Sequence, residues 1–358
     1  MSLPAPIRAA LVWLSFAFAL TLLPSVLCAE SATGVGLRAV QVHDPVNGGT
    51  MPGYVFYPSA QAKGSTWIAP YDVAASADAA VIPGAKPLVV ISHGNGGSNL
   101  DLHDLATYLA GHGFIVATIE HPKDNFHDQS GVGQAPVLDG RPIQLRATID
   151  FLLADAQWKK LIDAKRIGVA GFSAGGYTSL LMVGAVPRFR RFIDYCHKYP
   201  GDALCAGAER MKAEAASRGQ SVEQTMDAVQ NDFTRWGKAA DPRVKSAFVM
   251  APLSLIFDAA GMASIDRPVF LYYGQNDQLA RPAENAEHIR PLIKNLASVK
   301  QIAQADHWVF LSPCSPAMSR RLPTMCSDPA GVDRVKVHAE IQADALAFFR
   351  NTLELQAP

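Results

Sequence analysis

The sequence has no excess of charge of either sign. Its 358 residues include 32 Lys and Arg and 32 Asp and Glu, so the formal net charge is +0, and no run of basic residues occurs. Nucleic-acid-binding proteins usually carry a basic patch or stripe. We therefore expect no nucleic-acid partner, and the charge balance selects neither an acidic substrate nor a membrane surface.

The sequence also has few long apolar runs. The run at residues 9–23 is shorter than the roughly 20 residues that a membrane-spanning helix needs. It follows Arg8 and precedes small residues that end at Ala29, which is the pattern of a secretory signal peptide. We predict a signal peptide over residues 1–29 and an exported protein, periplasmic or secreted. An uncleaved anchor and a lipoprotein modified at Cys28 are the alternatives.

Cysteine is scarce, with five in the whole chain. No CxxC or Cys/His spacing suggests zinc. Without Cys28, the remaining four form two close pairs along the sequence. Four cysteines allow three pairings, and close spacing in an exported protein favours Cys196 with Cys205 and Cys314 with Cys326. Free buried thiols are the alternative.

Short apolar runs alternate with helical patterns along the rest of the chain. Runs that end in Gly, Pro or polar residues are typical of strands buried on both faces, and they occur at 87–94, 114–122, 166–173, 246–252 and 267–274. Two earlier strands are predicted over 35–42 and 50–58, then a loop or poorly ordered segment over 58–86. Helices are predicted over 99–113, 143–160 and 335–353. This order predicts an α/β fold with a mainly parallel sheet, helices on both faces, and an active site at the carboxyl ends of the strands.

One segment interrupts the alternation. Residues 187–243 show no strand pattern but contain three helical stretches with aromatic and charged residues. We interpret this insertion as a helical cap or lid on a single core formed by residues 30–186 and 244–358. A peripheral excursion that never touches substrate is the alternative.

The stretch GFSAGG, residues 171–176, places Ser173 between small residues directly after an apolar run. A strand that turns sharply into a helix would expose such a serine, and small neighbours would let the backbones pass closely. We predict that Ser173 is a nucleophile. A hydroxyl needs a base to activate it, and the base needs an acid to fix its tautomer.

Candidates for both partners follow in the order serine, acid, histidine that this type of site requires. Asp277 comes directly after the run at 267–274, and His307 follows the last short strand pattern. Asp258 and Asp306 are alternative acids. The other downstream histidines, His288 and His338, lie within apparent helices.

Two backbone N–H groups are predicted to hold an oxyanion. Ala174 follows the serine at a helix N-terminus, where the dipole favours negative charge. Asn95 lies in the glycine-rich stretch SHGNGGS, residues 92–98. A strand-to-helix turn without a catalytic role is the alternative reading of that stretch, and we interpret His93 as a structural residue that orders it.

A polar cluster, EHPKDNFHD, follows the run at 114–122. Its His121, Asp124, His127 and Asp128 are of metal-ligating types, but a cluster of this kind after a strand is more often solvated or lines a pocket. We therefore expect no metal.

Together, SHGNGG, EHP, GFSAGG, the Asp277 loop and ADHW resemble the α/β-hydrolase superfamily, in particular the predicted dienelactone hydrolase group that is similar to platelet-activating-factor acetylhydrolases. The resemblance runs from about residue 37 to the final helix, except for the insertion. It implies an α/β-hydrolase fold and hydrolysis of carboxylic esters through an acyl-serine without a cofactor. Dienelactone hydrolases have a cysteine where this chain has Ser173, and the acetylhydrolases carry their acid where it has Ala251 and Pro252. Neither the lactone nor the phospholipid substrate therefore carries over directly.

The sequence thus predicts an exported serine esterase that acts on a small-molecule ester. Two alternatives stay open: a lipase or phospholipase whose lid opens at a lipid surface, and a non-catalytic binding protein with a hydrolase fold. The sequence makes no prediction of the oligomeric state.

Overall fold

The computed structural model describes residue 1 and residues 33–205, 212–213, 215–233 and 235–354. The predicted signal peptide, apart from Met1, lies outside the described residues, as does part of the predicted middle helix of the insertion. Within the described ranges, no helix is both long and apolar enough to cross a membrane.

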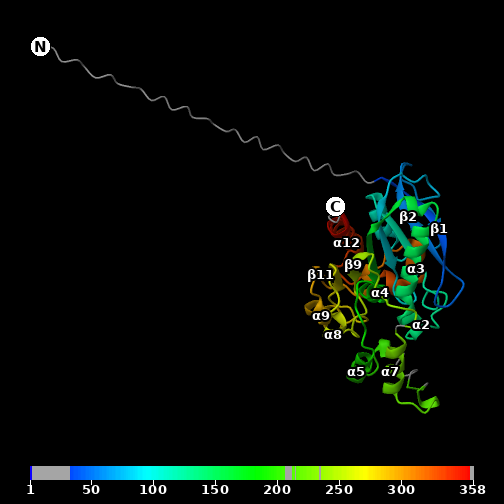
Figure 1. Cartoon of the computed structure of the whole chain (residues 1–358), viewed down its shortest axis with the longest axis vertical. Helices are drawn as coiled ribbons and strands as arrows, with labels where there is room; N and C mark the ends of the chain where they lie inside the picture. The colour runs from blue at the N-terminus through cyan, green and yellow to red at the C-terminus, as the bar shows by residue number, and fades with distance from the viewer. Residues whose placement is uncertain (2–32, 206–211, 214, 234, 355–358) are drawn as a thin grey trace. The chain divides into compact units, whose positions relative to one another are not determined.

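A nine-stranded sheet forms the centre of the described chain, in the order β11-β10-β9-β8-β6-β7-β2-β1-β5 (Figure 1). Neighbouring strands from β11 to β7 are all parallel, whereas β2 pairs antiparallel with both β7 and β1. The parallel strands are β6 (Lys86–Ser92), β7 (Ile115–Ile119), β8 (Ile162–Phe172), β9 (Val244–Met250), β10 (Val269–Gly274) and β11 (Leu296–Ile302). The predicted mainly parallel α/β sheet is confirmed.

Alternation of side chains along the central strands divides the core into two layers. In β6, Leu88 and Val90 pack in one hydrophobic cluster, whereas Val89 and Ile91 pack in the other. Successive residues of a strand point to opposite faces, so a strand with consecutive apolar residues such as this one needs cover on both sides. The first cluster includes residues of α3 (Gly140–Ala154) and α4 (Ala174–Met182), and the second includes residues of α1 (His103–Gly111) and α12 (Arg334–Phe349).

The antiparallel end of the sheet corrects one prediction. Strands β1 (Gly34–His43) and β2 (Thr50–Ser59) occur where they were expected. Residues 58–86, however, are not simply a loop, since they contain β3 (Thr66–Ile68), β4 (Tyr71–Val73) and β5 (Ser76–Ala77). β3 and β4 form a small hairpin, and β5 pairs in parallel with β1 at the sheet edge. These strands have only two or three residues each, too few for a pattern of alternating polarity to reveal them.

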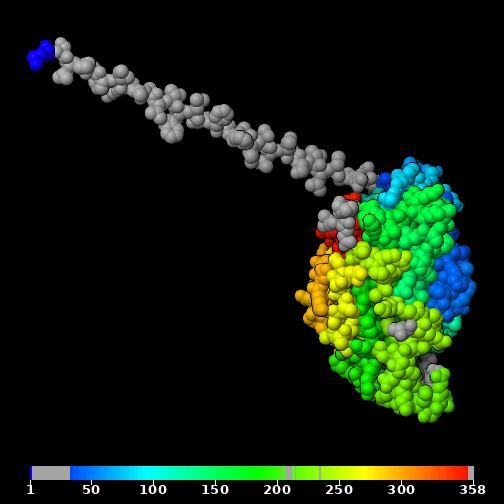
Figure 2. All heavy atoms as spheres, viewed as in Figure 1, coloured from blue at the N-terminus to red at the C-terminus, as the bar shows by residue number. Residues whose placement is uncertain are grey.

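The insertion between α4 and β9 holds helices and no strand in its described part. Its elements are α5 (Arg190–Lys198), the 3-10 turn η2 (Ala203–Cys205) and α7 (Val222–Asp232). In α7, Ser221 caps the N-terminus and exchanges hydrogen bonds with Gln224. Figure 2 shows the coloured residues of this segment, in green to yellow-green, gathered at the lower end of the view.

Both predicted disulfides are present. Cys196 at the end of α5 bonds to Cys205, and Cys314 bonds to Cys326. The second bridge closes the segment that follows the His307 turn, which contains α10 (Pro316–Arg321) and α11 (Pro323–Cys326). The remaining short elements are α2 (Ala135–Leu138), η1 (Trp158–Lys160), α8 (Ala259–Met262), η3 (Pro282–Glu284), α9 (Ala286–Ile289), η4 (Arg290–Leu292), η5 (His307–Phe310) and the π-helical η6 (Arg350–Glu354).

Candidate active site

Ser173 stands at the turn between β8 and α4 in a strained backbone conformation, with φ 55° and ψ −116°. For a residue other than glycine this costs about 1–3 kcal/mol and persists only where the surroundings enforce it. The surroundings do so here: the Ser173 N–H donates to the carbonyl of Met250 over 2.9 Å, and its carbonyl accepts from the N–H of Leu253 over 3.0 Å. The turn is thus fixed from β9, the neighbouring strand.

The small residues around Ser173 are required by close backbone crossings. A Cβ added at Gly171 would overlap the backbone of Gly175, and one added at Gly175 would overlap the carbonyl oxygen of Ser92 at the end of β6. The structure therefore explains why the GFSAGG stretch has glycines on both sides of the serine.

Asp277 and His307 form a buried pair at the ends of neighbouring strands. His307 Nδ1 donates to Asp277 Oδ2 over 2.6 Å, and the two side chains are 5% and 0% exposed. The other carboxylate oxygen, Oδ1, accepts the backbone N–H groups of Leu279 and Ala280 over 2.8 and 2.7 Å. Since Asp277 holds Nδ1, the tautomer with a free Nε2 lone pair is favoured, which is what a general base requires.

The His307 ring lies beside the serine turn. Its centroid is 4.7 Å from that of Phe172, the residue directly before Ser173. The turn that carries His307 begins at Asp306, whose side chain accepts the N–H of Trp308 over 3.0 Å. Asp306 is therefore a cap of η5 and not the partner of the imidazole.

The other candidate acid and bases have different contacts. Asp258 caps α8 by accepting the N–H of Gly261. His288 bonds to the carbonyl of Phe257, and His338 pairs with Asp104 and with the carbonyl of Val309. Among the described residues, the acid–histidine pair beside the Ser173 turn is therefore Asp277 with His307.

The glycine-rich loop after β6 lies against the serine turn. An added Cβ at Gly94 would be 3.4 Å from the Cβ of Ser173. His93 donates from Nδ1 to the Gly94 carbonyl over 2.7 Å and accepts the His121 N–H at Nε2 over 3.0 Å, the contacts of a histidine that orders a loop. The N–H groups of Asn95 and Ala174 have no acceptor among the described residues.

A cavity of about 1010 Å³ lies beside the serine turn, and both Asn95 and Ala174 line it. Its apolar wall includes residues of α2, α4 and the loop after β9. Residues of the insertion form another part of the wall, among them Phe189, Phe192, Leu204, Met226 and Val229. Ligand pockets are commonly concave, mostly apolar and a few hundred to about 1,000 Å³ in volume, so the cavity is large enough for a sizeable apolar group.

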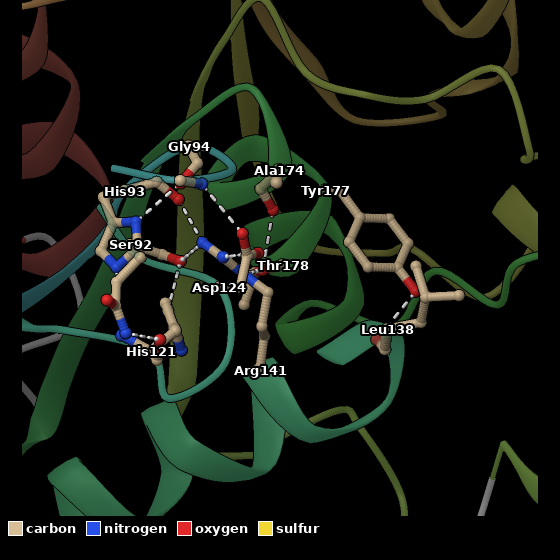
Figure 3. A network of polar contacts seen from close by, with 12 residues as sticks. Ser92, His93, Gly94, His121, Asp124, Leu138, Arg141, Ala174, Tyr177 and Thr178 are labelled. Carbon is tan, nitrogen blue, oxygen red and sulfur yellow. Dashed lines mark hydrogen bonds and ion pairs between the residues drawn. The ribbon is translucent and has the colours of Figure 1, made fainter. Parts of the chain in front are cut away.

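A buried polar network behind the loop was not predicted from the sequence (Figure 3). The expectation that His121 and Asp124 are solvated or line a pocket is wrong, because both are fully buried and neither lines the cavity. Asp124 pairs with Arg141 over 2.5 Å, and His121 bonds to Ser92 and Gln144. The described residues include no group of three or more His, Cys, Asp or Glu arranged to hold a metal ion.

Burial controls the protonation of this network. Desolvation, with the positive charge of Arg141, lowers the pKa of His93 to about 3 and that of His121 well below its ordinary value. Both histidines are therefore neutral at physiological pH. Desolvation also raises the pKa of Asp139 at the start of α3 to about 8, with a smaller contribution from the charge of Asp232 in the cavity wall.

Comparison with known proteins agrees with this architecture. The family model described as platelet-activating factor acetylhydrolase, isoform II, matches residues 64–132, which include β6, the glycine-rich loop and β7. The structure is similar to a solved ferulic acid esterase from Streptomyces cinnamoneus, with a TM-score of 0.58 and 20% sequence identity. The match covers 92% of this chain and 94% of the esterase chain. No curated protein matches the chain in sequence. The protein therefore has the α/β-hydrolase fold and is similar, over residues 64–132, to platelet-activating-factor acetylhydrolases.

Proposed function

We propose that the protein is a serine hydrolase of carboxylic esters with Ser173, His307 and Asp277 as its catalytic triad. The observation that carries the proposal is the buried 2.6 Å hydrogen bond between His307 and Asp277, with the imidazole packed beside the strained serine turn. The family match and the likeness to a ferulic acid esterase support an esterase or acetylhydrolase type of reaction.

In the proposed reaction, His307 Nε2 takes the hydroxyl proton as Ser173 Oγ attacks the ester carbonyl carbon. The tetrahedral intermediate collapses, the C–O bond to the alcohol breaks, and His307 gives its proton to the leaving alcohol. Water, deprotonated by His307, then attacks the acyl-serine, and the acid is released as Ser173 regains its proton. Asp277 stabilises the imidazolium that forms in both halves of the reaction.

The oxyanion is proposed to accept the N–H groups of Ala174 and Asn95. Ala174 is the first residue of α4, where the helix leaves its first N–H groups without internal acceptors and the dipole favours negative charge. Both residues line the cavity. Donors fixed in advance at the place where charge develops are worth about 10²–10³ in kcat each.

The cavity supports a substrate with a sizeable apolar group on its acyl or alcohol side. Insertion residues line this cavity, so we propose that the 187–243 segment acts as a cap over the core formed by residues 30–186 and 244–358. A lid that opens at a lipid surface is the second candidate, favoured by the same lining residues. The two disulfides fit export, which we propose together with a signal peptide at residues 1–29.

The test is a hydrolysis profile against p-nitrophenyl esters from acetyl to palmitoyl, with Ser173→Ala beside the wild type. We expect activity that Ser173→Ala abolishes while the melting temperature is kept, and covalent labelling of Ser173 by a fluorophosphonate, located by peptide mass spectrometry. Ser264→Ala is the matched control, because Ser264 is exposed and bonds only to the Gly184 carbonyl.

Substantial esterase activity in Ser173→Ala, or label on another residue, would refute the triad. A folded wild type that neither hydrolyses any ester nor takes the label would favour the binding-protein alternative. A jump in rate above the critical micellar concentration of a long-chain ester would favour the lipase alternative.

A further inference from the structure

Arg141 and Asp124 form an ion pair in the interior of the protein. The two side chains are 1% and 0% exposed, and Arg141 Nη1 lies 2.5 Å from Asp124 Oδ2. Removing two charges from water costs several kcal/mol per ion, and replacing such a pair by apolar side chains often leaves stability unchanged or improved. A contribution to the stability of the fold therefore explains this ion pair poorly. The other hydrogen bonds of Arg141 and Asp124 indicate a different role.

The pair holds the glycine-rich loop on both sides of Asn95. Arg141 Nη2 donates to the carbonyl of His93 and, over 3.1 Å, to the hydroxyl of Ser92. Asp124 Oδ1 accepts the N–H of Gly96 over 2.9 Å. His93 and Gly96, which flank Asn95 in the loop, are thus bound to the two members of one buried ion pair. These bonds restrain the direction of the Asn95 N–H between them.

Arg141 also reaches the first turn of α4. Its Nε donates to the Thr178 hydroxyl over 3.1 Å, and that hydroxyl donates to the Ala174 carbonyl over 2.8 Å. Figure 3 shows Arg141 between the loop at Ser92 to Gly94 and the helix that carries Ala174 and Thr178. One planar guanidinium therefore connects the two segments that carry Asn95 and Ala174, both of which line the cavity.

We propose that Arg141, held by Asp124, is a positioning residue that sets the spacing between the Asn95 and Ala174 N–H groups, so that both reach one oxyanion. The proposal rests on the proposed esterase function. Since only the transition state carries the oxyanion, loss of this spacing lowers kcat and leaves ground-state binding unchanged.

The test compares Arg141→Met, Arg141→Lys and Asp124→Asn with wild type on p-nitrophenyl butyrate. We expect kcat to fall by about 10- to 100-fold in Arg141→Met with KM within about twofold. Inhibition by butylboronic acid, which forms a tetrahedral anionic adduct on a serine, should weaken by the same factor as kcat. Inhibition by butyramide, a neutral ground-state ligand, should change much less. Arg141→Lys keeps the positive charge but has one donor nitrogen in place of three. Its kcat and boronate affinity should therefore lie between those of wild type and Arg141→Met.

Arg146→Met is the matched control. Arg146 is also on α3, but it bonds to the carbonyls of Lys238 and Ala240 and not to the loop or α4. Its loss should lower the melting temperature without changing kcat or the boronate affinity. Rates are referred to the active fraction, titrated with the fluorophosphonate.

Wild-type kcat and boronate affinity in folded Arg141→Met would overturn the proposal, as would equal weakening of boronate and butyramide inhibition. If Arg141→Met does not fold, Arg141→Lys and Asp124→Asn decide by the same two readouts. Failure of the proposed esterase function is recognised separately. In that case the fluorophosphonate would not label Ser173 in the wild type, and Ser173→Ala would not reduce hydrolysis.

Discussion

The sharpest prediction concerns the carboxylate that holds the imidazole. Asp277 Oδ1 accepts two backbone N–H groups, from Leu279 and Ala280, and Oδ2 accepts from His307. In Asp277→Asn, the two backbone donors still need an acceptor, so the amide oxygen should take the place of Oδ1. The amide NH₂ then faces His307 Nδ1, which can pair with it only as an acceptor.

This exchange moves the imidazole proton to Nε2, the nitrogen that accepts the Ser173 proton in the proposed mechanism. The variant therefore has the wrong tautomer in an almost unchanged geometry. Loss of the correct tautomer in a triad costs about 10⁴-fold in kcat, or roughly 5 kcal/mol of transition-state stabilisation. We expect a fall of this size in Asp277→Asn, with KM changed by less than about threefold because the carboxylate makes no contact with the substrate.

The assay is the steady-state hydrolysis of p-nitrophenyl acetate, with circular dichroism to verify folding. Asp258→Asn is the control, since Asp258 is the other acid that the sequence offered and an asparagine can still accept the Gly261 N–H at the start of α8. It should retain activity within about twofold. A loss below about tenfold in Asp277→Asn, or an equal loss in Asp258→Asn, would refute the reasoning.

Three further predictions concern stability. The Asp139 pKa of about 8 means that the folded protein keeps a proton that the unfolded chain releases near pH 4, so stability falls as pH rises between these values. Asp139→Asn should remove on the order of 2 kcal/mol of that fall, measured by urea unfolding at pH 5 and pH 8. A variant whose urea midpoint declines as much as that of wild type would contradict this. Gly175→Ala should cost about 1–3 kcal/mol in thermal unfolding, because its Cβ overlaps the Ser92 carbonyl; an unchanged melting temperature would show that the crossing relaxes. Replacing both Cys196 and Cys205 by serine should cost about 2–3 kcal/mol, and reductant should lower the melting temperature of wild type more than that of the variant.

The elements that the sequence predicted well are those with a dense local pattern. Strands such as β6 have an apolar middle and end at glycine-rich or polar turns, so their approximate limits follow from composition. The GFSAGG stretch requires small residues because backbones cross there. β3, β4 and β5 were missed because two or three residues carry too little pattern. β3 and β4 pair only with each other, and the pairing of β5 depends on the distant strand β1.

The candidate site shows the same division. Ser173, Asp277 and His307 were chosen from strand-end positions and chain order, and the structure adds the 2.6 Å contact between the last two. Arg141 was missed, since nothing in the pattern of a helix distinguishes a buried arginine from an exposed one. Its partners lie 17 to 49 residues away in sequence, so no local signal could have found it.

The sequence by itself predicted the α/β alternation, favoured the cysteine pairing that the structure has, and supplied the proposed nucleophile, acid and base in the expected order. These properties are local, because strand and helix patterns and loop closure depend on neighbouring residues. Only the tertiary structure decided that β5 completes the sheet, that the cavity has a wall from the insertion, and that Asp124 is paired in the interior with Arg141. Burial and charge pairing depend on residues that folding brings together from distant parts of the chain, and no local pattern encodes them.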